Sequence, residues 1–153
     1  MAMVSVRVEA RGLSDVKIFL DGVKRRMVNL SPAMKKAAVL MLGSVDKNFK
    51  SGGRPAPWRP LAFSTLREKR RKGYSPLPLT RTGQMKRSIA EGFPSQNSFS
   101  IGTAVKYARI HQYGGRAGRG HRANIPARPF LVFQGQDLSR IEGLILEHIN
   151  ADR

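Results

Sequence analysis

The chain contains no cysteine, so disulfide bonds and thiolate chemistry are excluded and the sequence fits a reducing cytoplasm. No stretch approaches the roughly 18 apolar residues of a membrane span, and the first residues lack the apolar segment of a signal peptide. We therefore expect a soluble, intracellular protein with no membrane partner.

Carboxylates are also scarce, with 10 Asp and Glu among 153 residues, and they are scattered along the chain. His111, His121 and His148 lack the spacing of metal ligands, and no cysteine could join them. The glycines of residues 114–118 are not followed by the Lys-Ser/Thr pair of a phosphate-binding loop. The sequence therefore predicts no catalytic residue, no metal and no cofactor, and the chain is expected not to be an enzyme.

Positive charge dominates what is present. The chain has 28 Lys and Arg and a formal net charge of +18. Solubility alone requires a net charge of only about 2–8 in a small domain. The excess indicates a polyanion such as nucleic acid, or an acidic protein surface, as the partner.

The length and the hydrophobic periodicity predict one domain over residues 1–153. The expected elements are a strand at 4–8, helices at 14–30, 31–51 and 65–72, a β-hairpin from 88–93 and 98–102, a helix or turn at 107–112, and a helix at 137–149. Ser14, Ser31, Thr65 and Asp137 are the expected N-caps. The predicted class is α+β: a small antiparallel sheet packed with two tandem N-terminal helices and a C-terminal helix, with long basic loops.

The first helix carries apolar residues at alternating spacings of three and four. Because this spacing places them on one face, they predict a stripe turned toward the core. The stripe consists of Leu13, Val16, Leu20, Val23, Met27 and Leu30.

A basic, Pro/Gly-rich excursion occupies residues 51–82. Its prolines remove backbone donors and restrict φ, and a connection this long is usually functional or disordered. The run Lys69, Arg70, Arg71 and Lys72 fits either a solvated helix face or a contact with DNA or an acidic partner. Trp58 fits either a local anchor that packs the excursion onto the domain or a side chain that docks in a neighbouring protomer.

Residues 100–132 form a second basic region, with six cations and no carboxylate. An Arg/Gly-rich loop at 114–124 places Arg116, Arg119 and Arg122 where they could meet DNA or an acidic partner. Pro126 and Pro129 stiffen the following residues, so we expect Arg128 to be presented for an assembly contact. Phe130 is expected to turn toward the core. His111 fits either a structural role at the base of the loop or a polar contact at a subunit interface.

Short motifs follow one another in order along most of the chain. They are Phe49 with Gly52-Gly53, residues 57–61 (PWRPL), residues 79–85 (LTRTGQM), residues 101–103 (IGT), Tyr107-Ala108, residues 110–112 (IHQ) with Gly114, and residues 125–131 (IPARPFL). In residue identity and spacing these motifs resemble those of the phage virion morphogenesis family, also called the tail completion or neck protein family. The tip 116–122 is richer in Arg and Gly than that family's pattern.

The resemblance implies a structural virion protein of a tailed phage, not an enzyme. It implies a tail completion or neck component that forms a homo-oligomeric ring, expected as a hexamer, around the DNA channel and supports head–tail joining. Its expected partners are head-completion or connector proteins, tail-terminator or tail-tube proteins, and packaged DNA held through nonspecific phosphate contacts. Its expected location is the neck or tail of the virion, and the host cytoplasm during assembly.

Six side chains are the candidates for the oligomer or partner interface: Trp58, Tyr107, His111, Gln112, Arg128 and Phe130. The alternative function is that of a stand-alone, sequence-nonspecific nucleic-acid-binding protein, in which the net charge alone accounts for binding. The motif residues are Gly, Pro, Tyr and Phe at turns, however, which does not match a recognition helix or a stacking platform.

Overall fold

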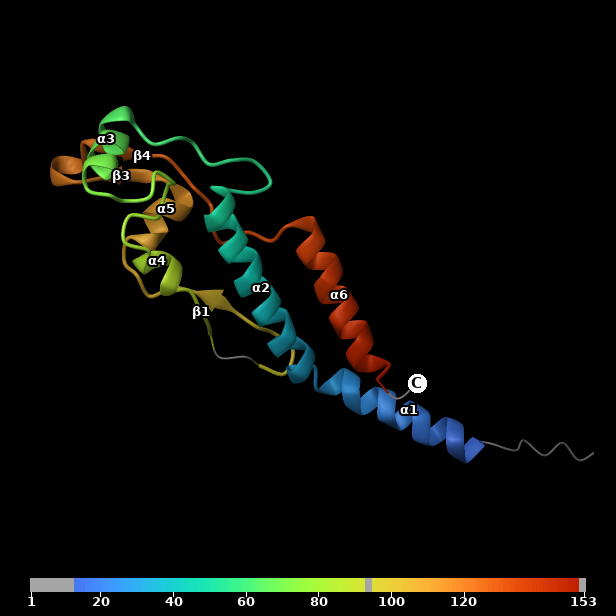
Figure 1. Cartoon of the computed structure of the whole chain (residues 1–153). Coiled ribbons are helices and arrows are strands. Elements are labelled where there is room, and N and C mark those ends of the chain that lie inside the picture. The colour runs from blue at the N-terminus through green and yellow to red at the C-terminus, as the bar shows by residue number, and fades with distance from the viewer. Residues whose placement is uncertain (1–12, 93–94, 152–153) are drawn as a thin grey trace, which may run out of the picture.

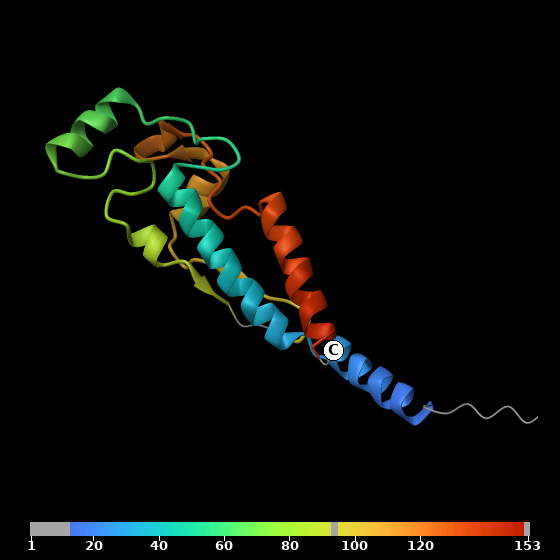
Figure 2. The same ribbon diagram turned by 45° about the vertical axis from the view of Figure 1, so that its right-hand side comes forward.

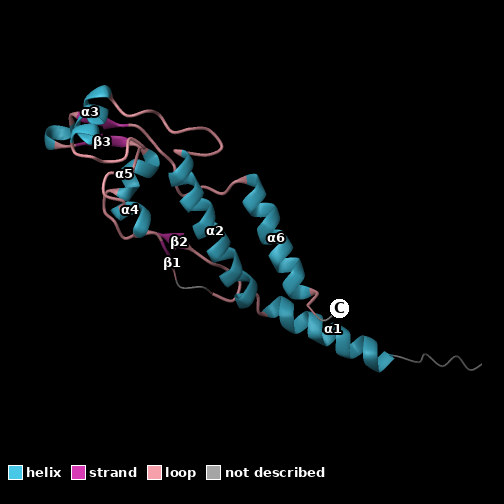
Figure 3. Ribbon diagram, in the orientation of Figure 1, coloured by secondary structure: helices cyan, strands magenta, loops and turns pink. Residues whose placement is uncertain are grey.

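The computed structural model describes residues 13–92 and 95–151, and the strand expected at 4–8 lies outside them. The α+β class is confirmed: six helices and two small antiparallel sheets lie within this part of the chain (Figure 3). In chain order the elements are α1 (Leu13–Val28), α2 (Ser31–Ser51), α3 (Phe63–Arg71), α4 (Gln84–Arg87), β1 (Ala90–Glu91), β2 (Ile101–Gly102), α5 (Ala108–Tyr113), β3 (Gly115–Ala117), a 3-10 turn (Arg119–His121), β4 (Ala123–Ile125) and α6 (Gly135–Ile149).

The molecule is elongated, with α2 and α6 side by side along its middle (Figures 1 and 2). Helix α1 continues beyond the end of this pair and projects from the body as an arm. The short elements α3, α4, α5, β3 and β4 gather at the other end of α2. The long axis therefore separates an amphipathic helical arm from a basic, loop-rich end.

Helix α2 is the central scaffold. Its small and flexible apolar residues recur on one face, where Ala33, Met34, Ala37, Ala38 and Met41 are all buried. Gly52 ends the helix in the left-handed conformation at φ +74, directly after the predicted helix end at residue 51. The expected N-cap Ser31 is wrong, because Leu30 is the N-cap residue and Ser31 already lies inside the helix.

The other expected caps are also displaced. Ser14 lies within α1, and α3 begins at Phe63, so the predicted capping box at Thr65 does not form. In α6 the N-cap is Gln134, and Asp137 is the third helical residue that completes a reciprocal capping box with it. The predicted starts lie within a few residues of the observed ones. The N-caps of α2 and α3 are Leu30 and Ala62, whose side chains make no cap hydrogen bond, so no polar residue marks these two starts.

Both sheets are two-stranded hairpins. The expected hairpin is present but shorter than predicted, with Ala90 opposite Gly102 and Glu91 opposite Ile101. The Arg/Gly-rich segment expected to be a loop is instead a second hairpin, in which Arg116 of β3 lies opposite Asn124 of β4. Glycines at positive φ, including Gly118 and Gly120, allow the chain to turn between these strands.

The main core lies where α2 meets the excursion and the segment after β4. The Phe49 ring packs edge-on to Trp58 at 5.7 Å between centroids and at 5.5 Å from Phe130. Met85 and Ala108 complete the buried cluster from α4 and α5. This core joins residues far apart in sequence and fixes the basic end of the molecule onto α2.

Candidate functional site

The backbone after β4 is held in place by one side-chain amide. Gln112 of α5 accepts hydrogen bonds through Oε1 from the backbone N–H groups of Phe130 and Leu131, at 3.0 and 3.1 Å. Its Nε2 donates to the carbonyl of Leu131 at 3.0 Å. The amide thus imitates the pairing of a neighbouring strand, which the segment lacks. Gln112 and the fully buried Phe130 have structural roles within the domain.

Arg128 is directed inward. It is 5% exposed, whereas the sequence analysis expected it at the surface. Its Nε donates to the carbonyl of Arg59 at 3.0 Å and its Nη2 to that of Pro60 at 3.1 Å. Burial, together with the nearby Arg59, lowers the pKa of the Arg128 guanidinium. A guanidinium group has five N–H donors and can therefore bind two successive carbonyl oxygens. Through these two hydrogen bonds Arg128 holds the excursion against the rest of the domain.

Trp58 makes the second attachment of the excursion. The indole is 7% exposed, and its Nε1 donates to the carbonyl of Pro129 at 2.8 Å. Of the two interpretations of Trp58, the structure supports the local anchor, because little of the indole surface remains for a partner. Trp58 and Arg128 therefore join the same two segments: Trp58 of the excursion donates to the segment after β4, and Arg128 of that segment donates to the excursion.

His111 lies half-buried in α5 with its ring edge-on to Tyr107, at 6.0 Å between centroids. Its Nδ1 is buried and has no hydrogen-bond partner among the described residues, while its backbone carbonyl accepts from the Arg128 N–H at 2.7 Å. Burial, and then the charge of Arg128, lower the pKa of the His111 imidazole. A neutral ring packed at the base of the loop fits the structural interpretation.

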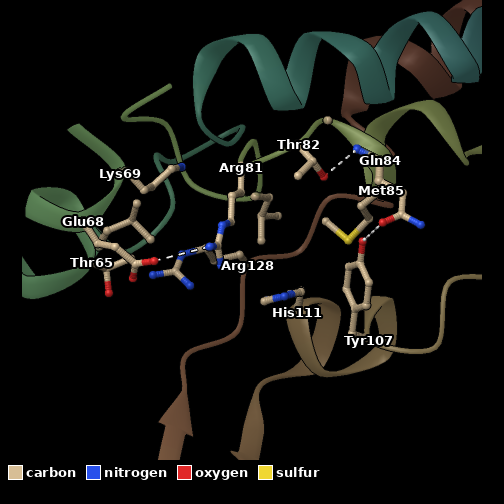
Figure 4. Close-up of a pocket in the computed structure, with 13 residues that line it drawn as sticks. Thr65, Glu68, Lys69, Arg81, Thr82, Gln84, Met85, Tyr107, His111 and Arg128 are labelled. Atoms are coloured by element: carbon tan, nitrogen blue, oxygen red, sulfur yellow. Dashed lines mark hydrogen bonds and ion pairs between the residues drawn. The ribbon is translucent and has the colours of Figure 1, made fainter. Parts of the chain in front are cut away.

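A cavity of about 300 Å³ opens beside this histidine (Figure 4). Leu61, Leu79 and Met85 contribute its apolar surface, and Tyr107 donates to Oε1 of Gln84 at 3.2 Å at its margin. Charged side chains from the excursion complete the lining: Glu68, Lys69 and Arg81. The cavity joins α3, α4 and α5, so Tyr107 and His111, both expected at an interface, share one hollow surface.

The cationic run of the excursion does not act as one patch. Lys69 is buried, and its Nζ donates to the Leu77 carbonyl at 2.6 Å, while burial and Arg81 lower the pKa of its ammonium. Lys72 pairs with Glu68 at 3.0 Å. Arg70 and Arg71 are exposed and have no ion pair within the described ranges. Besides Lys72, Arg71 lies near enough to Glu68 to help lower the pKa of that carboxyl, so Arg70 is the cation of this run with the least interaction among the described residues.

The second hairpin presents a stronger cationic surface. Arg116, Arg119 and Arg122 are all exposed on β3, the turn and the approach to β4, and none has an ion pair in the described part of the chain. No carboxylate occurs between Glu91 and Asp137 in the sequence. The structure therefore gathers these three arginines on one hairpin, which we call the basic hairpin (residues 115–125).

Two features escaped the sequence analysis. The basic hairpin was missed because its strands are only three residues long, too short to show an alternating apolar pattern. The exposure of α1 was missed because an apolar stripe does not reveal whether its cover comes from the same chain. Val16, Leu20 and Met27, expected in the core, are 55%, 57% and 57% exposed.

Within residues 13–92 and 95–151, no group of His, Asp and Glu side chains is placed to hold a metal ion. The same residues contain no helix with the length and apolar character needed to span a membrane.

Comparisons with known proteins agree on one family. Residues 12–150 match the phage virion morphogenesis family. The chain is 36% identical over 144 residues to Mu-like prophage FluMu G protein 2 of Haemophilus influenzae, covering 94% of this chain and 93% of that protein. It is 32% identical over 153 residues to tail completion protein S of Escherichia phage P2, covering 90% of this chain and 99% of that protein. No solved structure matches the chain.

Proposed function

The chain belongs to the phage virion morphogenesis family, and from this premise we propose how it acts in the particle. Its similarity to tail completion protein S makes it a structural tail completion protein of a tailed phage, and not an enzyme. We propose that copies assemble into a ring, a hexamer in the simplest case, around the DNA channel in the neck or tail. In that position the ring supports the joining of head and tail.

The observation that carries the ring proposal is the separation of two kinds of surface at opposite ends of one elongated molecule (Figure 1). One end is α1, whose apolar side chains are exposed; the other holds the basic hairpin. A row of exposed apolar side chains is typical of a protein–protein contact, whereas cations without ion pairs are typical of a contact with a polyanion. A subunit with both can bind its neighbours at one end and direct charge at DNA with the other.

Packaged DNA would be held through its phosphates. Arg116, Arg119 and Arg122 are exposed on the basic hairpin and have no ion pair among the described residues, which suits sequence-independent contact with a backbone of alternating sugars and phosphates. Such contacts weaken steeply with salt: in a plot of the logarithm of the binding constant against the logarithm of the salt concentration, the slope falls by about 0.9 for each phosphate neutralised. A ring multiplies these contacts around the channel, so each subunit needs to contribute only a few.

The remaining partners follow from the same proposal. A ring between head and tail must contact head-completion or connector proteins on one side and tail-terminator or tail-tube proteins on the other. The cavity beside Tyr107 and His111, with its apolar surface and charged margin, is a suitable place for a side chain of such a protein. Assembly would occur in the host cytoplasm and leave the protein in the virion.

The test combines mass, shape and particle assembly. Light scattering and negative-stain imaging of the purified protein at low and high salt should show closed rings, alone or after purified tails are added. Tails made without the protein should fail to join heads and should recover when it is supplied. A protein that remains monomeric under all these conditions and does not restore joining would refute the proposal.

A stand-alone nucleic-acid-binding protein is the alternative, and the net charge of +18 favours it. It requires the monomer itself to bind duplex DNA tightly. Replacing Arg116, Arg119 and Arg122 by Gln should then abolish function altogether. On the ring proposal the same replacement lowers the salt dependence of DNA binding, but it leaves ring formation intact.

A further inference from the structure

Helix α1 carries an apolar seam that the described residues of its own chain leave mostly uncovered. The apolar residues repeat at spacings of three and four from Val16 through Leu20 and Val23 to Met27, which is the pattern of a helix that packs lengthwise against another helix. Val16, Leu20 and Met27 are all more than half exposed, and Phe19 beside them is 45% exposed. An amphipathic helix that leaves this face in water lacks the packing that normally stabilises it.

Among the described residues, the hydrogen bonds between the α1 region and α6 lie at the end of α1 nearest α2. Arg26 donates through Nε to the carbonyl of Ile149 at the end of α6, at 2.8 Å, and the His148 ring bonds the Asn29 carbonyl at 2.9 Å. Val23 is half-buried there. Helix α1 therefore contacts α6 at one end and extends past it (Figure 2), and the apolar side chains along that extension are exposed.

A complementary surface exists on the outer side of α6. Leu138 and Leu146 are 50% and 59% exposed, and Glu142 lies between them, four residues from each. Glu142 is exposed and has no ion pair in the described part of the chain. The same helix is the one net-acidic helix within the described residues of this strongly basic chain. Its charged side chains are Asp137, Arg140, Glu142 and Glu147.

We propose that the α1 seam of one copy packs lengthwise on the outer face of α6 in the next copy, an inference that rests on the proposed ring. The two helices match in length, with 16 and 15 residues, or about 24 and 22 Å. Lys17 and Lys24 stand three and four residues from Leu20, beside the seam, where they can approach Glu142. The occupant of the α1 seam is thus a second copy of this chain.

This contact uses different surfaces on the two partners. Each copy donates α1 to one neighbour and receives α1 on α6 from another, so the interface is heterologous and can close into a ring. Pairing of α1 with α1 would be isologous and would stop at a dimer. The distinction allows a test that does not depend on the absolute affinity.

The test uses three matched variants in the full chain. Leu20→Asp places a charge in the α1 seam, Leu146→Asp places one on the α6 face, and Val39→Asp is the control at a 65% exposed apolar position of α2. We expect each of the first two to weaken self-association about 30-fold or more, as at an interface hot spot, and the control to assemble like the wild type. Circular dichroism should show that all three variants remain folded, since each site is exposed.

Mixing the first two variants provides the decisive measurement. The Leu20→Asp chain keeps a sound α6 face and the Leu146→Asp chain a sound α1 seam, so a mixture should form one-to-one dimers that grow no further. Because the chain has no cysteine, Leu20→Cys and Leu146→Cys in separate chains should also cross-link to each other and not to themselves.

Other outcomes would overturn the inference in distinguishable ways. If Leu146→Asp assembles normally while Leu20→Asp does not, the α1 seam pairs with itself or with another protein. If rings form in all three variants, the interface lies elsewhere, and the proposed ring function stands without it. If the wild type stays monomeric at every concentration, the inference fails, and recovery of head–tail joining then decides the proposed function separately.

Discussion

Replacing Trp58 tests whether the excursion is fastened to the core or reserved for a partner. Trp58→Ala removes an indole that is 7% exposed, together with its edge contact to Phe49 and its hydrogen bond to the Pro129 carbonyl. Truncating a buried aromatic side chain to alanine costs about 3–5 kcal/mol. Within that range the aromatic pair accounts for about 0.5–1.5 kcal/mol and the hydrogen bond for about 1 kcal/mol.

Trp58→Phe is the matched control. It retains a ring against Phe49 but loses the N–H donor, so its free energy of unfolding should fall by only about 1–2 kcal/mol. Both values come from urea unfolding followed by far-UV circular dichroism. The protein should be dilute enough that self-association contributes nothing to the measured stability.

The two interpretations of Trp58 predict opposite results. An anchor lowers the stability of the monomer, whereas a side chain that docks in a neighbour leaves the monomer unchanged and weakens assembly. A loss below about 1 kcal/mol in Trp58→Ala, with the slope of the urea transition unchanged, would refute the packing argument.

Three further predictions concern the same end of the molecule. Gln112→Ala should lower the free energy of unfolding by about 1–3 kcal/mol, measured by urea denaturation, since it leaves backbone groups of residues 130–131 without partners. Gly114→Ala should lower the melting temperature, because φ is +76 and a Cβ would lie 2.8 Å from the Ala127 nitrogen, whereas Gly43→Ala, with nothing within 4 Å, should not. His111 has a lowered pKa in the folded chain, so the unfolded chain binds its proton more readily. Stability should therefore be intact above about pH 6.5 and fall as the pH drops through that value. His111→Gln should reduce this fall in denaturation curves measured across pH, and parallel curves for the two proteins would contradict the assignment.

Local patterns in the sequence were sufficient to identify the helices. The spacing of apolar residues predicted α1, α2 and α6, and Gly52 marked the end of α2, because helix periodicity and a left-handed C-cap depend on neighbouring residues. The first hairpin was also found, at reduced length. Helix starts were misplaced, because α2 and α3 begin after Leu30 and Ala62, residues whose side chains make no cap hydrogen bond.

The arrangement of the candidate site could not be predicted from such local patterns. Arg128 and Lys69 were expected at the surface, but their donors are used by backbone carbonyls that come close only in the folded chain. A surface cation is normally solvated. Here the carbonyl of Leu77 accepts from Lys69, and those of Arg59 and Pro60 accept from Arg128, which satisfies the donors of both side chains away from water. Conversely, Arg116, Arg119 and Arg122 meet nothing acidic in the described structure and remain available.

The sequence by itself determined the charge, the helical scaffold and the motifs of the family. These follow from composition and from residues near one another in the chain. Only the tertiary structure decided which side chains are free for assembly. It buried Trp58 and Arg128 and left the apolar seam of α1 in solvent. The physical reason is that exposure depends on which distant segment supplies the covering surface, and no local pattern specifies that segment.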